Sequence, residues 1–185
     1  MQYELTTPCT AADLAPLKAG DTVLLSGVVY TARDQAHKRM LEALDKGEKL
    51  PFDLEGSAIY YVGPTPERPG EVIGSAGPTT SGRMDAMSPR LLDLGNKVMI
   101  GKGKRDAAVK EAVVRNGAVY LAALGGAGAL MAQSVKTLEV IAWPDLGCEA
   151  VRRLTVEDMP LTVILDAHGG DLYESGPEAY KTSGC

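Results

Sequence analysis

The chain alternates between short apolar segments and longer segments in which apolar residues recur every three or four positions. Residues 21–30 (DTVLLSGVVY) are apolar and rich in β-branched side chains, which predicts a buried strand. Residues 32–46 place Ala36 and Met40 on one face, which predicts a helix that Thr31 caps and Gly47 ends. The same strand–helix pattern recurs along the chain.

The remaining elements follow from the same periodicities. Strands are expected at residues 57–62, 71–76, 98–100, 118–123, 138–143 and 161–165. Helices are expected from residue 83 or 84, at residues 105–115 with Asn116-Gly117 as the stop, and at residues 127–135. This alternation predicts an α/β domain with a mainly parallel central sheet. The pattern does not distinguish a doubly wound sheet from other α/β arrangements. We expect one domain over residues 1–172 and a mobile tail over residues 173–185.

Composition and charge exclude several classes of function. The 185 residues carry a net charge of -5, which argues against a general nucleic-acid binder. The longest apolar run, residues 118–132, is interrupted by glycines and is shorter than the roughly 20 residues that a membrane span needs. The N-terminus lacks the basic and apolar blocks of a signal peptide. These features predict a cytoplasmic protein without nucleic-acid or membrane partners.

The cysteines predict no metal site within this chain. Cys9, Cys148 and Cys185 lie far apart and form no C-x-x-C pair, so we expect reduced thiols. The segment 166–171 (DAHGGD) has the residue types of a metal site. A glycine-rich turn that closes a strand is the more frequent role for such a segment, and we favour that interpretation.

Three polar loops, residues 31–37, 77–83 and 101–104, are the candidate sites of chemistry. Each follows a predicted strand, precedes a helix and carries at least one cation. In open α/β sheets, ligands bind beyond the carboxyl ends of the strands. The loops therefore predict a local anion-binding site on an otherwise acidic chain.

Each loop also has a simpler explanation. The hydroxyls of residues 79–81 followed by Arg83 predict an anion site at a helix N-terminus, although one of them alone could cap the helix. Arg33 and His37 are four residues apart, and on spacing alone a solvated polar face is the favoured interpretation. Lys102 lies between two glycines, which fits either a close approach to a ligand or an exposed turn.

Taken together, these loops resemble a known family. The segments TARDQAHKR (31–39), GPTTSGRMD (77–85), IGKG (100–103) and LGCEA (146–150) resemble the C-terminal region of class I fumarases, which also occurs as the β subunit of two-subunit fumarate hydratases and L-tartrate dehydratases. The resemblance covers nearly the whole chain in order. It implies a swivelling β/β/α domain with a parallel central sheet and a second sheet.

The resemblance also implies a reaction and its machinery. The reaction is the reversible hydration of fumarate to L-malate, or the dehydration of L-tartrate, at a 4Fe–4S cluster held by a partner α subunit. Thr79 resembles the catalytic base. Arg33 and Arg83 resemble the carboxylate-binding arginines, and Lys102 completes the cationic pocket. His37 and Thr80 match the motifs as supporting residues, and α2β2 is the expected assembly.

We therefore expect the β subunit of an iron–sulfur hydro-lyase that acts on a C4 dicarboxylate and is active only with its α subunit. A fixed cluster of cations suits a substrate with two negative charges, and it would stabilise the charge that builds next to a carboxylate when a proton leaves. Two alternatives stay open. They are a non-catalytic module that binds carboxylate or phosphate and a domain that serves mainly as an assembly partner.

Overall fold

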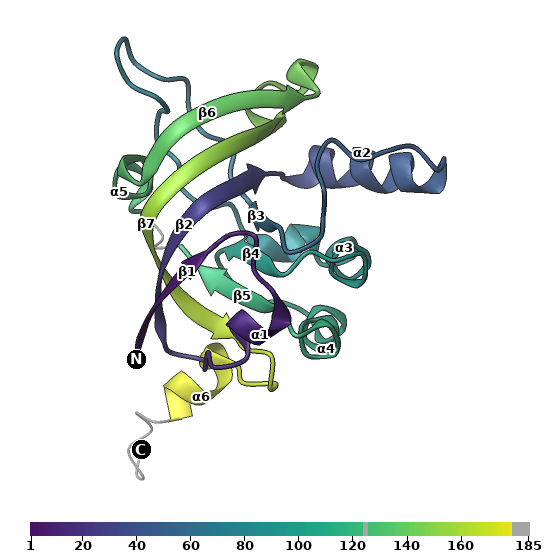
Figure 1. Cartoon of the computed structure of the whole chain (residues 1–185), viewed down its shortest axis with the longest axis vertical. Helices are drawn as coiled ribbons and strands as arrows, with labels where there is room; N and C mark the ends of the chain where they lie inside the picture. Colours follow the sequence, from purple (N-terminus) through teal and green to yellow (C-terminus); the bar gives the residue numbers. More distant parts are fainter. Residues whose placement is uncertain (124–125, 179–185) are drawn as a thin grey trace.

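The computed structural model describes residues 1–123 and 126–178 and contains seven strands and six α-helices within these ranges (Figure 1). The strands are β1 (Gln2–Thr6), β2 (Thr22–Thr31), β3 (Ala58–Tyr60), β4 (Val98–Gly101), β5 (Val119–Ala122), β6 (Val135–Ala142) and β7 (Val151–Leu165). The helices are α1 (Ala11–Leu14), α2 (Asp34–Asp45), α3 (Ser88–Asp93), α4 (Ala107–Asn116), α5 (Gly128–Gln133) and α6 (Leu172–Glu178). Two 3₁₀ helices, η1 (Ser81–Met84) and η2 (Pro144–Glu149), complete the set.

Five strands close into a mixed β-barrel. β2, β3, β4 and β5 pair in parallel in that order, and β7 pairs antiparallel with both β5 and β2 to close the ring. β1 extends β2 in parallel, and β6 extends β7 as an antiparallel strand. All seven strands belong to one hydrogen-bonded sheet, so the separate second sheet that the resemblance implied is absent from the described residues. The mainly parallel centre is confirmed, but it is a closed barrel and not an open sheet.

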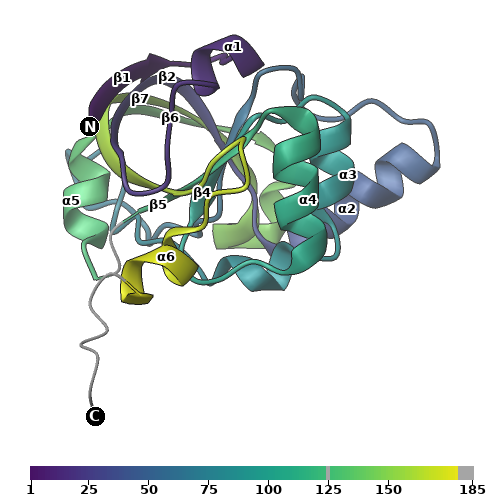
Figure 2. The ribbon, with the colours of Figure 1, turned by 90° about the horizontal axis from the view of Figure 1, so that it is seen from below.

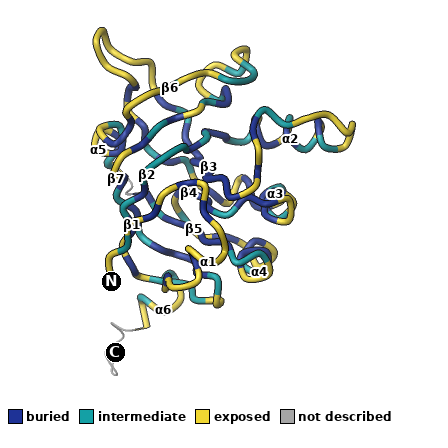
Figure 3. Tube along the Cα trace, viewed as in Figure 1, coloured by how far each residue is buried: buried dark blue, intermediate teal, exposed yellow. Residues whose placement is uncertain are grey.

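Both faces of the central strands are buried, which explains their continuous apolar sequences. Tyr60 and Ile100 belong to one apolar cluster, which includes inward residues of all five barrel strands. The alternate residues, such as Ile59 and Met99, belong to a second cluster with residues of α2, α3 and α4. Successive side chains of a strand point to opposite faces, so each central strand contributes to both clusters. Figure 3 shows buried residues along these strands and on the inner sides of the helices.

The helices α2, α3 and α4 lie on one side of the barrel and α5 lies on the other (Figure 2). The Asp106 side chain accepts the N–H of Val109 and caps α4, and Gly117 ends it in the left-handed conformation. The stop at Asn116-Gly117 is therefore confirmed. Gly47 follows the last residues of α2 with a φ of 70°, as the expected stop requires.

Several expected elements differ from the observed ones. The strand expected at 71–76 is wrong, because this segment folds back on Thr65 and not onto the sheet. Thr65 and Ser75 exchange two hydrogen bonds, and a Cβ at Gly74 would lie 2.4 Å from Thr65 atoms. The expected cap at Thr31 is also wrong. Thr31 ends β2, and its hydroxyl donates to the Ala150 carbonyl and accepts the N–H of Arg152.

Other differences concern the lengths and bounds of the helices and strands. The helix expected from residue 83 or 84 is a 3₁₀ turn at Ser81–Met84, followed by α3 from Ser88. The strand expected at 161–165 is only the end of the 15-residue β7, and β1 and α1 had no predicted counterpart. Residues 172–178 form α6, whereas residues 179–185 of the expected tail lie outside the described ranges. Within those ranges, the helices are too short or too polar to cross a membrane.

Candidate functional site

The barrel places the three predicted loops along one rim. Thr31 of β2 pairs with Tyr60 of β3, and Tyr60 pairs with Ile100 of β4, so the carboxyl ends of these strands are level. Arg33 follows β2 and Lys102 follows β4. The chain leaves the rim after β3 and returns at Thr79, whose N–H donates to the Tyr61 carbonyl at 2.7 Å. The register of parallel strands therefore brings together residues that are distant in the sequence.

Arg33 and Arg83 share one carboxylate, that of Asp34. The Nε of Arg83 lies 2.8 Å from Asp34 Oδ1, and the Nη2 of Arg33 lies 3.7 Å from Asp34 Oδ2. The Arg33 side chain is 20% exposed and the Arg83 side chain is 54% exposed. The structure therefore joins these two predicted substrate-binding residues, although sequence reasoning had assigned no role to Asp34.

Glu149 also contacts the Nη2 of Arg33. Its Oε1 lies 3.3 Å from Arg33 Nη2, and its Oε2 accepts the N–H of Gln35 at 3.0 Å. Gly63 lies against the guanidinium, since a Cβ there would be 2.8 Å from Arg33 Nη1. Sequence reasoning missed Glu149 as a functional residue. The available signal was its place in the LGCEA segment, which carried part of the resemblance.

Two buried side-chain atoms in this cluster lack a hydrogen-bond partner. They are Arg33 Nε, a donor, and Asp34 Oδ2, an acceptor, and no other such atom occurs among the described residues. A buried polar atom without a partner costs about 1–3 kcal/mol, so proteins usually pair these atoms. Both exceptions lie in the one cluster that the sequence predicts to bind substrate carboxylates.

Lys102 and the segment from Thr79 to Ser81 adjoin one another. Thr80 and Lys102 form a parallel bridge, the N–H of Ser81 donates to the Lys102 carbonyl, and Ser81 Oγ accepts the N–H of Lys102. Thr80 precedes η1 and makes no side-chain cap. The alternative in which Thr80 only caps the helix is therefore wrong, and anion binding by these hydroxyls stays a prediction. η1 has only four residues, and the cations here are side chains.

His37 is buried, and its ring contacts the backbone at the start of α2. Its Nδ1 lies 3.0 Å from the Arg33 carbonyl, and its ring meets Tyr61 edge-on with centroids 5.3 Å apart. Burial lowers the pKa of His37 to about 4, and the positive charge of Arg105 acts in the same direction. The ring is therefore neutral near pH 7, and its Nδ1–H donates to the Arg33 carbonyl, which can only accept. The solvated polar face favoured on spacing alone is wrong.

The described residues do not fit an iron–sulfur cluster, which requires several converging thiolates. Cys148 is exposed on η2, whereas Cys9 is buried between β1 and α1. Burial, followed by the charge of Asp13, raises the pKa of the Cys9 thiol to about 11. No group of three potential metal ligands occurs in the part of the chain that the structure describes. Cys185 lies outside that part.

The segment around Asp166 is a structural turn, as we expected. The Asp166 carboxylate accepts the N–H groups of Ala19, His168 and Gly170 at 2.8–2.9 Å. Burial by itself would raise the pKa of Asp166, but these three donors lower it below its usual value. The His168 ring contacts the Ala15 carbonyl at 2.7 Å. Asp166 therefore ties the end of β7 to the loop before β2.

One cavity lies at the 65–75 loop, and the predicted site residues do not line it. Its volume is about 470 Å³, and it is lined by residues of the 65–75 loop, α5 and the start of β6. A second cavity of about 360 Å³ is lined by Pro64, Cys148 and Arg152, next to the residues that hold Arg33. We place the candidate site at the arginine cluster, because the two buried polar atoms without a hydrogen-bond partner lie there.

Comparison with known proteins shows to which family this chain belongs. The family model described as "Fumarase C-terminus" matches residues 1–176. The chain belongs to this family. It is 43% identical to a putative L(+)-tartrate dehydratase subunit beta of Methanocaldococcus jannaschii over 171 residues, which cover 89% of this chain and 88% of that protein. It is 33% identical to the L(+)-tartrate dehydratase subunit beta of Escherichia coli over 177 residues, covering 93% and 87%.

The same family includes part of longer enzymes. This fumarase C-terminal chain is 38% identical to the aerobic class I fumarate hydratase of Escherichia coli over 165 residues, which cover 88% of this chain and 30% of the enzyme. The chain thus spans about 30% of the length of the class I fumarate hydratases that it matches. Its family is one of hydro-lyase β subunits and C-terminal domains.

Proposed function

We propose that this chain is the β subunit of a hydro-lyase that adds water reversibly to fumarate to give L-malate. The observation that carries the proposal is the arginine pair on the barrel rim, in which Arg33 Nε is buried without a partner beside Asp34. The Nε–H of Arg33 has no partner among the described residues, so it is the donor that this arginine offers to a carboxylate, which it binds with a charge-assisted hydrogen bond. Two arginines suit a ligand with two carboxylates.

In this proposal the cations bind and orient the substrate. Arg33 takes one carboxylate through its Nε–H, and the more exposed Arg83 takes the other. Lys102, on the adjoining loop, adds a third positive charge. The barrel strands position the loops that carry these charges, and Glu149 holds the Arg33 side chain before the substrate arrives. Such preorganised charge stabilises negative charge as it develops in a transition state.

Thr79 is the proposed base. In the direction from malate to fumarate, its alkoxide accepts the C3 proton, and the electrons of the C–H bond form the C2–C3 double bond. The C2 hydroxyl leaves with its bonding pair and becomes water by taking a proton from an acid of the partner subunit. The nearby cations favour the alkoxide and the negative charge on the adjacent carboxylate. Thr79 is half-buried, which limits access of water to its hydroxyl.

The partner is an α subunit that carries the iron–sulfur cluster which the resemblance implies. The described residues of this chain do not offer a thiolate set, so we assign them no part in holding the cluster. The names of the relatives that match over most of their length, both "subunit beta", support the expectation of a second subunit. We propose an α2β2 assembly.

A second candidate reaction is the dehydration of L-tartrate. It is favoured by the two relatives that match this chain over 88% and 87% of their own lengths, which are both named tartrate dehydratase β subunits. Tartrate differs from malate by one hydroxyl, so the same arginines can bind both. The unpartnered acceptor Asp34 Oδ2 could receive a hydrogen bond from such a hydroxyl.

The test is a direct comparison of both substrates with the same reconstituted complex. The chain is combined anaerobically with the α subunit encoded in its own genome, and iron and sulfide are supplied. Fumarate consumption is followed by its ultraviolet absorbance and tartrate dehydration by the oxaloacetate formed. The proposal expects fumarate to be turned over with the higher kcat/KM. A higher value for tartrate would establish the second candidate, and activity on neither would reject the hydro-lyase assignment.

A further inference from the structure

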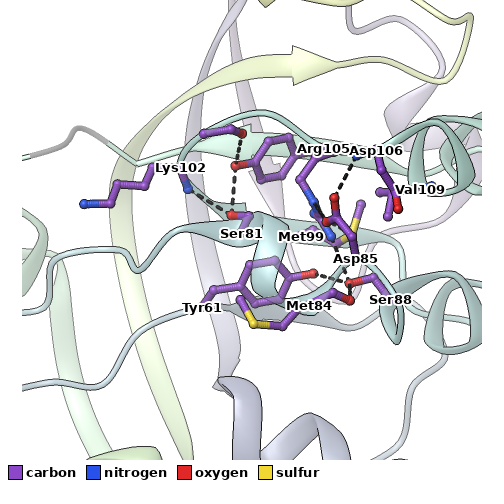
Figure 4. Close-up of polar contacts among 12 residues, drawn as sticks. Tyr61, Ser81, Met84, Asp85, Ser88, Met99, Lys102, Arg105, Asp106 and Val109 are labelled. Atoms are coloured by element: carbon purple, nitrogen blue, oxygen red, sulfur yellow. Dashed lines mark hydrogen bonds and ion pairs between the residues drawn. The ribbon is translucent and has the colours of Figure 1, made fainter.

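A buried polar network links the segment that carries Thr79 and Arg83 to Lys102 (Figure 4). At its centre is Ser81, which is fully buried and was singled out in the sequence only as one of three consecutive hydroxyls. Lys102 itself points away from this network in Figure 4. The network therefore holds the backbone of Lys102 and leaves its ammonium group for other contacts.

Ser81 clamps Lys102 with two hydrogen bonds. Its N–H donates to the Lys102 carbonyl at 2.9 Å, and its Oγ accepts the N–H of Lys102 at 3.0 Å. The close approach depends on Gly101, because a Cβ at that position would lie 1.9 Å from Ser81 Oγ. Ser81 therefore fixes both polar groups of the Lys102 backbone relative to the segment that begins at Thr79.

Tyr120 extends this clamp to the next residue of the loop. Its hydroxyl oxygen lies 2.9 Å from Ser81 Oγ and 3.0 Å from the Gly103 carbonyl. Tyr120 has one hydroxyl proton, and the carbonyl can only accept. Both contacts are satisfied when Tyr120 donates to Gly103 and Ser81 Oγ–H donates to Tyr120. The Lys102 N–H, Ser81, Tyr120 and Gly103 then form one directional chain.

Arg105 anchors the C-terminal end of the segment from Thr79 to Asp85. Its side chain is fully buried, its Nε lies 2.6 Å from Asp85 Oδ1, and its Nη2 donates to Ser88 Oγ at 2.9 Å. Its guanidinium also stands over the rings of Tyr61 and Tyr120, at 5.3 and 5.0 Å from their centroids. A cation removed from water in this way needs such partners. The segment is thus fixed at Asp85 as well as at Ser81, with Arg83 between them.

We propose that Ser81 is a positioning residue that sets Lys102 relative to Thr79 and Arg83 for the reaction. The proposal rests on the proposed function, because it assigns Ser81 a task in that same site. Ser81 touches no substrate; it acts through the backbone of Lys102 and through its own neighbours along the chain. Displacing groups of an active site by about 1 Å can lower the rate about a hundredfold, so the clamp has a kinetic consequence.

The test compares Ser81→Ala with two other variants in the reconstituted complex. Ser57→Ala is the matched control, because Ser57 is also a buried serine with a hydrogen bond, to Asn96, but it precedes β3 at the opposite end of the strand. Tyr120→Phe removes the tyrosine hydroxyl while Ser81 keeps both bonds to Lys102. We expect kcat to fall at least about tenfold for Ser81→Ala, and by less than about threefold for the other two.

A purely structural role gives a different pattern. If only stability mattered, the loss of kcat would follow the loss of stability in urea unfolding, and Tyr120→Phe, which removes two contacts, would be at least as damaging as Ser81→Ala. Equal kcat for Ser81→Ala and Ser57→Ala would overturn the proposal. If the alanine variant does not fold, Ser81→Cys takes its place, since sulfur is a weak acceptor; wild-type kinetics in that variant would overturn the proposal.

A second measurement does not depend on activity. Amide hydrogen exchange in the full chain should become at least about tenfold faster at Lys102 in Ser81→Ala, while Ile100 in β4 keeps its wild-type rate. Unchanged exchange at Lys102 would overturn the proposal. If the wild-type complex turns over neither substrate, the proposed function fails by itself, and amide exchange still decides whether Ser81 holds Lys102.

Discussion

Arg33 Nη2 and Glu149 Oε1 lie 3.3 Å apart, although the two residues belong to distant parts of the chain. The other oxygen of Glu149 accepts the N–H of Gln35, so the same carboxylate fixes the side chain of Arg33 and the first turn of α2. The η2 loop thereby sets the direction of an arginine that follows β2. A guanidinium held in this way loses little conformational entropy when it binds a carboxylate.

Replacing Arg33 by lysine should weaken substrate binding. Lysine has no Nε–H donor and no planar fork, so Arg33→Lys loses the unpartnered donor and the fixed direction of the guanidinium. A hydrogen bond to a charged group contributes about 1.5–3 kcal/mol, which corresponds to a rise in KM of about tenfold to a hundredfold. The control is Arg39→Lys, on the same helix, where Arg39 pairs with the exposed Asp145. Equal KM values for the two variants would contradict the site assignment.

Removing the Thr79 hydroxyl should abolish turnover and leave binding nearly intact. Thr79→Val keeps the shape of the side chain but cannot accept a proton, and loss of a general base lowers kcat by about 10²–10⁴-fold. Thr137→Val is the control, because Thr137 is an exposed threonine on β6. The measurement is kcat and KM for fumarate and tartrate in the reconstituted complex. A non-catalytic binding module would instead show the same dicarboxylate affinity and no activity in wild type or variant.

The stability of the chain should fall as His37 becomes protonated. The pKa of His37 is about 4 in the folded chain and 6.5 in a model compound, so the unfolded chain binds more protons between these values. The contribution is complete above about pH 6.5 and is lost as the pH falls toward 4; the depression corresponds to about 3 kcal/mol. Arg105 and Asp34 are the charged groups that act on the ring.

Urea unfolding from about pH 7 to about pH 4 measures this effect. His37→Asn can still donate to the Arg33 carbonyl, so it should lose the pH dependence that belongs to this window. His168→Gln is the control, because His168 is exposed on the turn after β7, and it should keep the wild-type pH dependence. The same pH dependence in His37→Asn and wild type would show that another group titrates.

Purified without a partner, this chain should form no iron–sulfur cluster and show no hydro-lyase activity. Cys9 is buried with a raised pKa and Cys148 is exposed on η2, so these two thiols do not converge. Anaerobic incubation with iron and sulfide, with and without the α subunit, gives the measurement. We expect the visible absorbance of a cluster and malate formation only when both subunits are present. A cluster bound by this chain alone would contradict the division of roles between the subunits.

Local patterns in the sequence were sufficient for much of the fold. The apolar stretches that became β2, β4 and β5 and the stop at Gly117 follow from side-chain chemistry within a few residues. The segment 71–76 has the same apolar character but pairs with Thr65, because Gly74 allows a close approach that excludes a ladder. Periodicity does not contain that information, since it concerns which neighbour is available in space.

Some residues of the candidate site can be found from the sequence, whereas others are recognised only in the structure. The motifs selected Arg33, Thr79, Arg83 and Lys102 as candidates, but only Arg33 and Lys102 directly follow strands of the structure, because the strand expected at 71–76 does not form. Asp34 and Glu149 were missed, since a carboxylate becomes a partner of an arginine only when the chain folds. His37 reads as a polar surface residue from its spacing, yet it is buried against Tyr61.

The sequence by itself determined the family resemblance, the α/β character and the residue types that can bind a dicarboxylate. The tertiary structure decided that the sheet closes, because β7 pairs with both β2 and β5, and no local pattern encodes a pairing between strands so far apart. It also decided that Glu149 holds the side chain of Arg33 and that Ser81 holds the backbone of Lys102. Residue types set what chemistry is available, whereas strand register and burial set which groups meet and how strongly they interact.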